Sequence, residues 1–162
     1  MDADKFQRLL TACHEVGGMY EPEIVFIGGI AVYLHAVNHT LTSAYAEMTA
    51  DADFYISLSA LSDLRDVEEV VQNSRLSKHS FQRQGVSFVV YTERQSALPV
   101  PYADVAAHAV RYEGVAVAPL EYLLLLKLEA AVDQHGSAHG QKDARDIIRI
   151  LLLAKQIGRA HV

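Results

Sequence analysis

Two short motifs carry residue types suited to phosphate and metal chemistry. Gly28 and Gly29 follow the apolar run 24–27, and Asp51 and Asp53 stand one residue apart further along the chain. A glycine pair between a strand and a helix lets the backbone approach a phosphate and aims free N–H groups at it. Two aspartates that alternate along a strand point to one face and can share a hard cation. Together the motifs predict a phosphate cradle that faces a metal site.

Each motif also has a purely structural interpretation. Glycine pairs allow a helix to pack closely on a strand, and aspartates cap turns at strand ends. The combination favours chemistry, because both motifs are expected at the same edge of one sheet. A structure that placed Gly28 far from Asp51 and Asp53 would favour the structural interpretation instead.

Composition limits the classes of protein that fit. The 162 residues are expected to form one domain over 1–162, and 51% hydrophobic with 21% charged residues is typical of globular chains. The net charge of −6 excludes a broad basic surface that coats nucleic acid, so any RNA contact must be local. The single cysteine, Cys13, excludes a disulfide framework and fits a reducing compartment.

We expect a cytoplasmic protein with no membrane partner. The first residues are acidic and polar, unlike the basic and then apolar start of a secretory signal. The longest apolar run, 120–128, contains Glu121 and Lys127 and is far shorter than the ~20 residues that cross a bilayer.

Hydrophobic periodicity and turn residues predict strands alternating with helices. The expected strands are 24–27, 52–58, a hairpin of 77–83 with 86–92, and 115–117. The expected helices are 4–17 stopped by Gly17-Gly18, 30–37, a helix capped by Ser59 or Ser62 that runs to about 73, 103–110, one from Pro119 to about 136, and 141–157; the segment 96–102 is expected to be extended.

These elements predict an α+β fold, an α/β sandwich with a small mixed sheet flanked by helices. Its core spans about 20–118, and a C-terminal helical part spans about 119–157. The apolar stripe of that part is most simply core, but Leu125 and Leu126 extend it around the helix and leave a homodimer open.

The motifs resemble those of the polymerase-beta type nucleotidyltransferase superfamily and, within it, AbiEii-like and other toxin-associated nucleotidyltransferases. The resemblance covers 24 to about 153, and it implies a nucleotidyltransferase-like fold. It rests on Gly-Gly-Ile-Ala at 28–31, Thr-Ala-Asp-Ala-Asp-Phe at 49–54, Leu-Lys-Leu-Glu-Ala at 126–130 and Lys-Asp-Ala-Arg-Asp-Ile at 142–147.

The resemblance also implies roles for the first two motifs. Gly28 and Gly29 would hold nucleotide phosphates, and Thr49 is the hydroxyl residue that precedes the metal-binding pair. Asp51 and Asp53 would bind Mg²⁺. Phosphoryl transfer needs mainly positioning and charge neutralisation, so these residue types suit it.

The third motif would lie near the nucleotide. Lys127 or Lys142 would neutralise the charge of the phosphates, and Asp143 belongs to the same Lys-Asp pair. The alternative is that charges near the start of a helix only cap or solvate it.

The chain departs from the family pattern at the third catalytic carboxylate. The strand that should supply it, 85–93, has Ser87 and Val89 at the inward positions, and Glu93 lies at its end. Two carboxylates could hold one Mg²⁺-nucleotide, but a two-metal mechanism is put in doubt.

A second departure is the glycine-rich link 133–140, where relatives carry a basic residue. We interpret its His135 and His139 as loop residues. His35 and His39 have the same spacing without further ligands nearby, so no zinc site is expected.

Two functions follow from the resemblance. One is a nucleotidyltransferase that binds a Mg²⁺-nucleoside triphosphate and transfers a nucleotide to RNA, tRNA included, or to a protein hydroxyl. The other is a catalytically degenerate member that acts as a binding or regulatory partner, for example of a cognate toxin or antitoxin protein. A carboxylate within reach of Asp51 and Asp53 would separate enzyme from relic.

Overall fold

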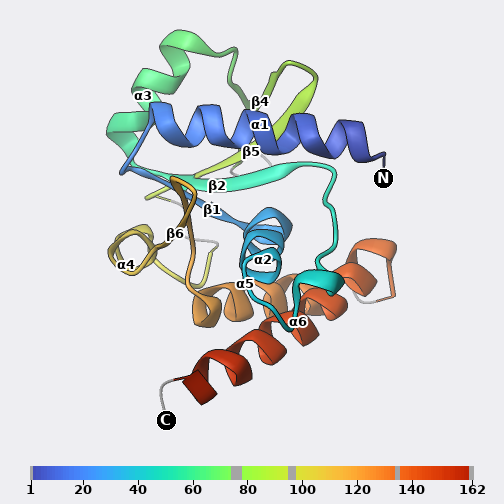
Figure 1. The fold of residues 1–162 in the computed structure, drawn as a ribbon. Coiled ribbons are helices and arrows are strands. Elements are labelled where there is room, and N and C mark those ends of the chain that lie inside the picture. Colours follow the sequence, from blue (N-terminus) through green and yellow to red (C-terminus); the bar gives the residue numbers. More distant parts are fainter. Residues whose placement is uncertain (1, 74–77, 95–97, 134–135, 161–162) are drawn as a thin grey trace.

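A mixed β-sheet forms the centre of the molecule (Figure 1). The computed structural model describes residues 2–73, 78–94, 98–133 and 136–160, and within these ranges the sheet has seven strands in the order β3-β4-β5-β2-β1-β7-β6. The strands are β1 (Ile24–Ile27), β2 (Ala52–Ile56), β3 (Val71–Asn73), β4 (Lys78–Arg83), β5 (Val86–Thr92), β6 (Val110–Tyr112) and β7 (Val115–Val117).

Helices cover both faces of this sheet. The helix nearest the N-terminus runs along one face, and the helix after the first strand packs below the other face together with the C-terminal helices in the view of Figure 1. The helices are α1 (Ala3–Met19), α2 (Gly28–Val37), α3 (Leu58–Val67), α4 (Tyr102–Ala107), α5 (Leu120–Asp133) and α6 (Ala138–Ala160), with a 3₁₀ turn at Ser43–Tyr45. The predicted α+β sandwich with C-terminal helices is confirmed.

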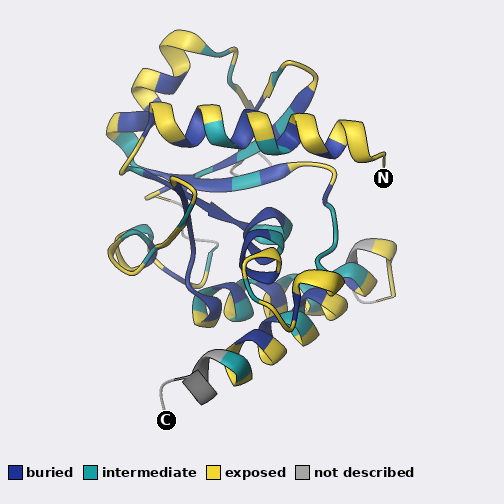
Figure 2. Ribbon diagram, in the orientation of Figure 1, coloured by how far each residue is buried: buried dark blue, intermediate teal, exposed yellow. Residues whose placement is uncertain are grey.

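The core lies on both faces of the central strands, against α1 on one face and against α2, α5 and α6 on the other (Figure 2). The fully buried Phe54 of β2 makes edge-to-face contacts with Phe26, Phe81 and Phe88, with ring centroids 5.7, 6.1 and 6.1 Å away. Aromatic pairs of this kind contribute about 1 kcal/mol each beyond the area they bury. Because side chains alternate along a strand, burying Phe54 on the α1 side turns Asp53 toward α2.

Two predicted ends in the first half of the chain were wrong, that of the first helix and that of the second strand. Helix α1 continues through Gly17 to Met19. Gly17 does not end the helix, because it is buried against Phe26 and allows the helix to pack closely on the sheet. Strand β2 ends at Ile56 instead of residue 58. The cap of α3 is Ser57, whose hydroxyl accepts the Ala60 N–H, and not Ser59 or Ser62 as predicted.

The predicted helix to about residue 73 ends instead at Val67, and 71–73 forms strand β3. This edge strand exists because β4 pairs with it antiparallel. Strand β6 was not predicted either; its pairing with β7 creates it. The hairpin of β4 and β5 is confirmed, although residue 77 lies outside the described ranges.

Later boundaries also shift. Helix α2 begins at Gly28 instead of residue 30, α4 ends at Ala107 instead of residue 110, and α6 begins at Ala138 instead of residue 141. The interpretation of His139 as a loop residue was therefore wrong, while His135 lies outside the described ranges.

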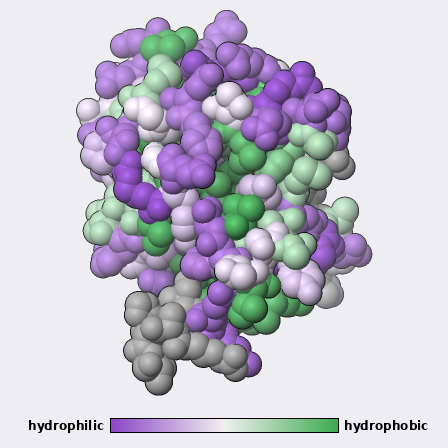
Figure 3. Space-filling model, viewed as in Figure 1, coloured by the Kyte–Doolittle hydropathy of each residue, from purple (hydrophilic) through white to green (hydrophobic). Residues whose placement is uncertain are grey.

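The outer face of α5 and α6 is apolar. Six large hydrophobic residues on it are exposed, and Figure 3 shows hydrophobic side chains gathered on this part of the surface. They are Leu125, Leu128, Val132, Ile148, Leu151 and Leu152. The homodimer stays a prediction. In the described ranges, we find no helix whose length and apolar character would let it cross a membrane.

Candidate functional site

The glycine turn and the aspartate strand meet at the start of α2. Antiparallel pairing of β1 with β2 sets Ile27 opposite Asp53, so the strand register delivers Asp53 to the residue just before the turn. Gly28 has φ +69°, and a Cβ atom built on it would stand 2.6 Å from Asp53 Oδ2. The position therefore requires glycine, both for its backbone conformation and for the space that the carboxylate occupies.

The second glycine touches two other candidates. A Cβ on Gly29 would lie 3.1 Å from Lys142 Nζ and 3.1 Å from Thr49 Oγ1. Thr49 comes from the segment before β2, and Lys142 comes from the first turns of α6. The first turn of α2 thus faces an ammonium group from α6, and a hydroxyl group and a carboxylate from the stretch 49–53.

Asp51 is placed differently from Asp53. It lies in the bend before β2 and is exposed, whereas Asp53 lies in the strand and is partly buried. The prediction that both aspartates lie on the strand was therefore wrong, because only Asp53 does. The Thr49 hydroxyl donates to the Asp51 backbone carbonyl at 3.4 Å, which ties the bend to the cradle.

Behind the cradle, Lys127 of α5 is held by two carboxylates of α6. Its Nζ donates to Asp143 Oδ1 at 2.7 Å and lies 3.0 Å from Asp146 Oδ2. Lys142 reaches the same Asp146 oxygen at 2.9 Å. Lys127, Asp143 and Asp146 are only 8%, 8% and 1% exposed. Burial acts to lower the pKa of Lys127, but Asp146 and Asp143 outweigh it and the pKa is raised.

Sequence reasoning missed a second ion-pair group that holds the segment before Asp51. Glu47 accepts from Arg145 and from Arg149, with its closest contacts at 2.8 and 2.6 Å, and Arg149 also contacts Asp146 at 3.0 Å. The Arg145 hydrogen bond, with Arg149, outweighs burial and lowers the pKa of Glu47 to about 2. The i, i+3 spacing of Asp146 and Arg149 was the available signal, but nothing local pointed to Glu47.

No third carboxylate joins Asp53 from the neighbouring strand. Parallel pairing sets Val89 opposite Asp53, and Ser87 and Val89 lie on the Asp53 face of β5. Glu93 lies beyond the opposite end of the strand, where its Oε1 accepts the Leu58 N–H at 2.7 Å. The part of the chain that the structure describes holds no group of three or more His, Cys, Asp or Glu residues that could bind a metal ion.

The His35 and His39 pair is packed into the fold. His35 is 1% exposed, with Nε2 2.8 Å from the Ala118 carbonyl and Nδ1 2.8 Å from the Tyr112 hydroxyl. Since a carbonyl only accepts, Nε2 carries the proton and the Tyr112 hydroxyl donates to Nδ1. His39 Nε2 lies 3.2 Å from the same hydroxyl. These bonds explain the spacing without a metal.

Solved structures of nucleotidyltransferase-like proteins have a similar architecture. An antigenic nucleotidyltransferase-like protein from Paracoccidioides brasiliensis matches with a TM-score of 0.57 at 19% identity, over 94% of this chain and 78% of that one. A proposed nucleotidyltransferase from Thermotoga maritima matches with a TM-score of 0.57 at 13% identity, over 82% and 89%. The fold is nucleotidyltransferase-like.

A longer protein shares the same fold. The Megavirus polyadenylate synthase matches with a TM-score of 0.55 at 10% identity, over 98% of this chain, which spans 35% of that protein. No protein-family model matches the chain, and no curated protein sequence matches it. At these identities the comparisons establish the fold of the chain.

The candidate site has donors suited to an anion and acceptors suited to a hard cation. The N-cap residue of α2 is Ile27, whose apolar side chain cannot accept a hydrogen bond from the helix start. Uncapped N–H groups at the start of a helix attract phosphate. Lys142 adds positive charge beside them. Asp51 and Asp53 offer the oxygen ligands that Mg²⁺ prefers, so the donor set fits this ion.

Proposed function

We propose that the chain binds a Mg²⁺-nucleoside triphosphate at the start of α2 and transfers a nucleotide to a hydroxyl group. The observation that carries this proposal is the meeting of the glycine turn with Asp53, Thr49 and Lys142, which come from two other segments, 49–53 and α6. A structural role for the motifs would not require an ammonium group and a carboxylate at one helix start.

Each residue has a distinct task in the proposed complex. The N–H groups of Gly28 and Gly29 bind phosphate oxygens, and Lys142 neutralises their charge. Asp51 and Asp53 would hold Mg²⁺, which when bound supplies charge neutralisation at the phosphates.

The two lysines are not equivalent in this proposal. The ammonium group of Lys127 is enclosed by Asp143 and Asp146, whereas the side chain of Lys142 is 21% exposed and adjoins Gly29. We therefore assign Lys142 to the nucleotide. Lys127 and Asp143 form a buried ion pair behind the site, which stabilises the fold and does not contact the nucleotide.

The proposed transfer forms one bond and breaks one. The acceptor oxygen bonds to the α-phosphorus as the bond from this phosphorus to pyrophosphate breaks, and the acceptor proton passes to solvent. The acceptor is RNA, tRNA included, or a protein hydroxyl, in the manner of AbiEii-like toxin-associated nucleotidyltransferases with a cognate toxin or antitoxin partner. The polyadenylate synthase among the structural neighbours favours RNA.

Calorimetric titration with ATP, CTP and GTP in the presence of Mg²⁺ tests the site. The double variant Asp51→Ala with Asp53→Ala should lose binding of the nucleotide that the wild type prefers, while its circular dichroism spectrum stays unchanged. Asp63→Ala, an exposed aspartate of α3, is the matched control and should bind normally. Undiminished binding in the double variant would contradict the proposal.

A second candidate function is a degenerate member that binds a nucleotide or a partner protein without transferring anything. The residue opposite Asp53 on β5 is Val89, at a position where relatives would place a carboxylate. This difference favours the degenerate function. Incubation with labelled nucleotides and bulk tRNA separates the two. Sustained incorporation that Asp53→Asn abolishes would exclude the degenerate function, and a wild type that binds but never incorporates would support it.

A further inference from the structure

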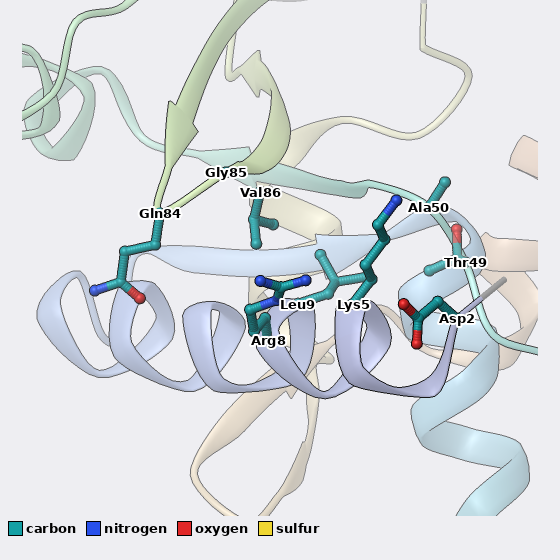
Figure 4. A pocket seen from close by; sticks show the side chains of 9 residues that line it. All are labelled: Asp2, Lys5, Arg8, Leu9, Thr49, Ala50, Gln84, Gly85 and Val86. Atoms are coloured by element: carbon teal, nitrogen blue, oxygen red, sulfur yellow. The ribbon is translucent and has the colours of Figure 1, made fainter.

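A cavity of about 490 Å³ lies on the α1 side of the sheet, beside the proposed nucleotide site. It opens between the start of α1, the turn that joins β4 to β5, and the segment before β2 (Figure 4). Volumes of roughly 300–1,000 Å³ suit small-molecule-sized groups. Its lining includes Lys5, Arg8, Leu9, Thr49, Ala50 and Val86.

The cavity is cationic in a chain of net charge −6. Lys5 and Arg8 are three residues apart on α1, which sets them on one helix face, and both side chains reach from the helix toward the strands (Figure 4). Neither forms an ion pair within the described ranges, in contrast to Arg83, Arg145 and Arg149. Asp2, the acidic lining residue, already accepts the Asp4 N–H as the cap of α1.

The floor of the cavity is apolar. Leu9 and Val86 are 2% and 7% exposed and belong to the core. A flat apolar group can lie on such a floor while an attached anion meets the cations at the rim. A nucleoside with its phosphate combines these two properties.

Thr49 connects this cavity with the nucleotide cradle. Its hydroxyl oxygen lies 3.1 Å from the position of a Cβ on Gly29, and the same residue lines the cavity together with Ala50. Asp51 follows directly in the chain. A ligand bound in the cavity therefore lies only one short segment, residues 49–51, away from the proposed reacting groups.

We propose that this cavity binds a phosphate and the adjoining nucleoside of a single-stranded RNA, which is the acceptor. Lys5 and Arg8 contact the backbone phosphate, and Leu9 and Val86 support the base or sugar. The transfer to this RNA rests on the proposed function, but RNA binding by the cavity does not. The proposal also reconciles the acidic chain with an RNA substrate, because the contact is local.

Salt-dependent binding of a labelled RNA of about 12 nucleotides tests the cavity, with fluorescence anisotropy as the readout. The variant Lys5→Gln with Arg8→Gln should bind roughly tenfold more weakly at low salt. Loss of the contacts to this one phosphate should also reduce the slope of log K against log salt by about 0.7. The control Lys155→Gln removes an exposed charge about 20 Å along α6 from Lys142 and should change neither quantity.

The outcomes distinguish this inference from the proposed function. Glutamine keeps the helix propensity of α1, so circular dichroism and Mg²⁺-nucleotide binding of the cavity variant should match the wild type. An unchanged affinity and slope in that variant would overturn the inference and leave the nucleotide site standing. Loss of RNA binding in a chain that binds no nucleotide would support the cavity and contradict the proposed function.

A competition experiment identifies the ligand class. Inorganic phosphate at an equal concentration of phosphate groups should leave the RNA bound, because it cannot use the apolar floor. Displacement by inorganic phosphate would show a general anion site and overturn the assignment to RNA.

Discussion

The Asp53 carboxylate occupies the space that a side chain on Gly28 would need. A Cβ on Gly28 would meet Asp53 Oδ2 at 2.6 Å and Asp53 Cβ at 3.4 Å. The turn that exposes the N–H groups of α2 and the strand that carries the acidic residue are therefore packed into each other. A change at one of these residues should be felt at the other.

Gly28→Ala should lower the free energy of unfolding by about 3 kcal/mol, because φ +69° disfavours a side chain and the added methyl collides with Asp53. Urea denaturation measures the loss. Mg²⁺-nucleotide binding should disappear with it, since Asp53 must move.

Gly114→Ala is the matched control for Gly28→Ala. Gly114 has φ +83° with open space around the added Cβ, so it isolates backbone strain and should cost about 1 kcal/mol. Equal losses at both positions would show that the contact with Asp53 contributes nothing.

Lys127→Met should destabilise the chain by about 3 kcal/mol, because it leaves Asp143 buried without its ammonium partner. The double variant Lys127→Met with Asp143→Leu removes both charges and should regain most of the loss. Chemical denaturation of the two variants gives the comparison.

The same variants separate the roles of the two lysines. The stability-restored double variant should bind Mg²⁺-nucleotide nearly as the wild type does, whereas Lys142→Gln should weaken binding roughly tenfold through one lost charged contact. The assignment of Lys142 to the nucleotide is wrong if the double variant loses binding and Lys142→Gln keeps it.

Glu47 should make the chain sensitive to acid. Its pKa is lowered from 4.5 to about 2, so its contribution to stability is fully present above about pH 4.5 and is lost as the pH falls toward 2. We expect this contribution to be about 1 kcal/mol after solvent screening.

Urea denaturation at pH 7 and at pH 3 measures this effect. Glu47→Gln should flatten the acid loss of stability, whereas Glu129→Gln, an exposed carboxylate of α5, should leave it unchanged. A wild type and a Glu47→Gln variant with the same pH profile would contradict the role of Glu47 in holding the segment that carries Thr49 and Asp51.

Local patterns in the sequence predicted the elements that local forces determine. The apolar run 24–27 and the Gly28-Gly29 turn predict a strand that enters a helix, because the backbone freedom of glycine is a property of the residue itself. The periodicity of the hairpin and of the C-terminal helices likewise reports directly which side chains are buried.

Pairing partners decided the elements that the sequence did not predict. The segments 71–73 and 110–112 are only three residues long each, so their periodicity carries little information, and they become strands because β4 and β7 supply hydrogen bonds. Gly17-Gly18 is typical of a helix end, but Gly17 packs against Phe26 and the helix continues through both glycines to Met19.

The candidate site shows the same division. Residue types and order in the sequence identified Gly28, Asp53 and Lys142 as possible partners in phosphate chemistry. Only the tertiary structure brought the Lys142 ammonium group beside Gly29, enclosed Lys127 between two carboxylates and set Val89 opposite Asp53. Residue types and their spacing determine structure over a few neighbouring residues. These contacts join segments up to about a hundred residues apart, so they form only once sheet register and helix packing are complete.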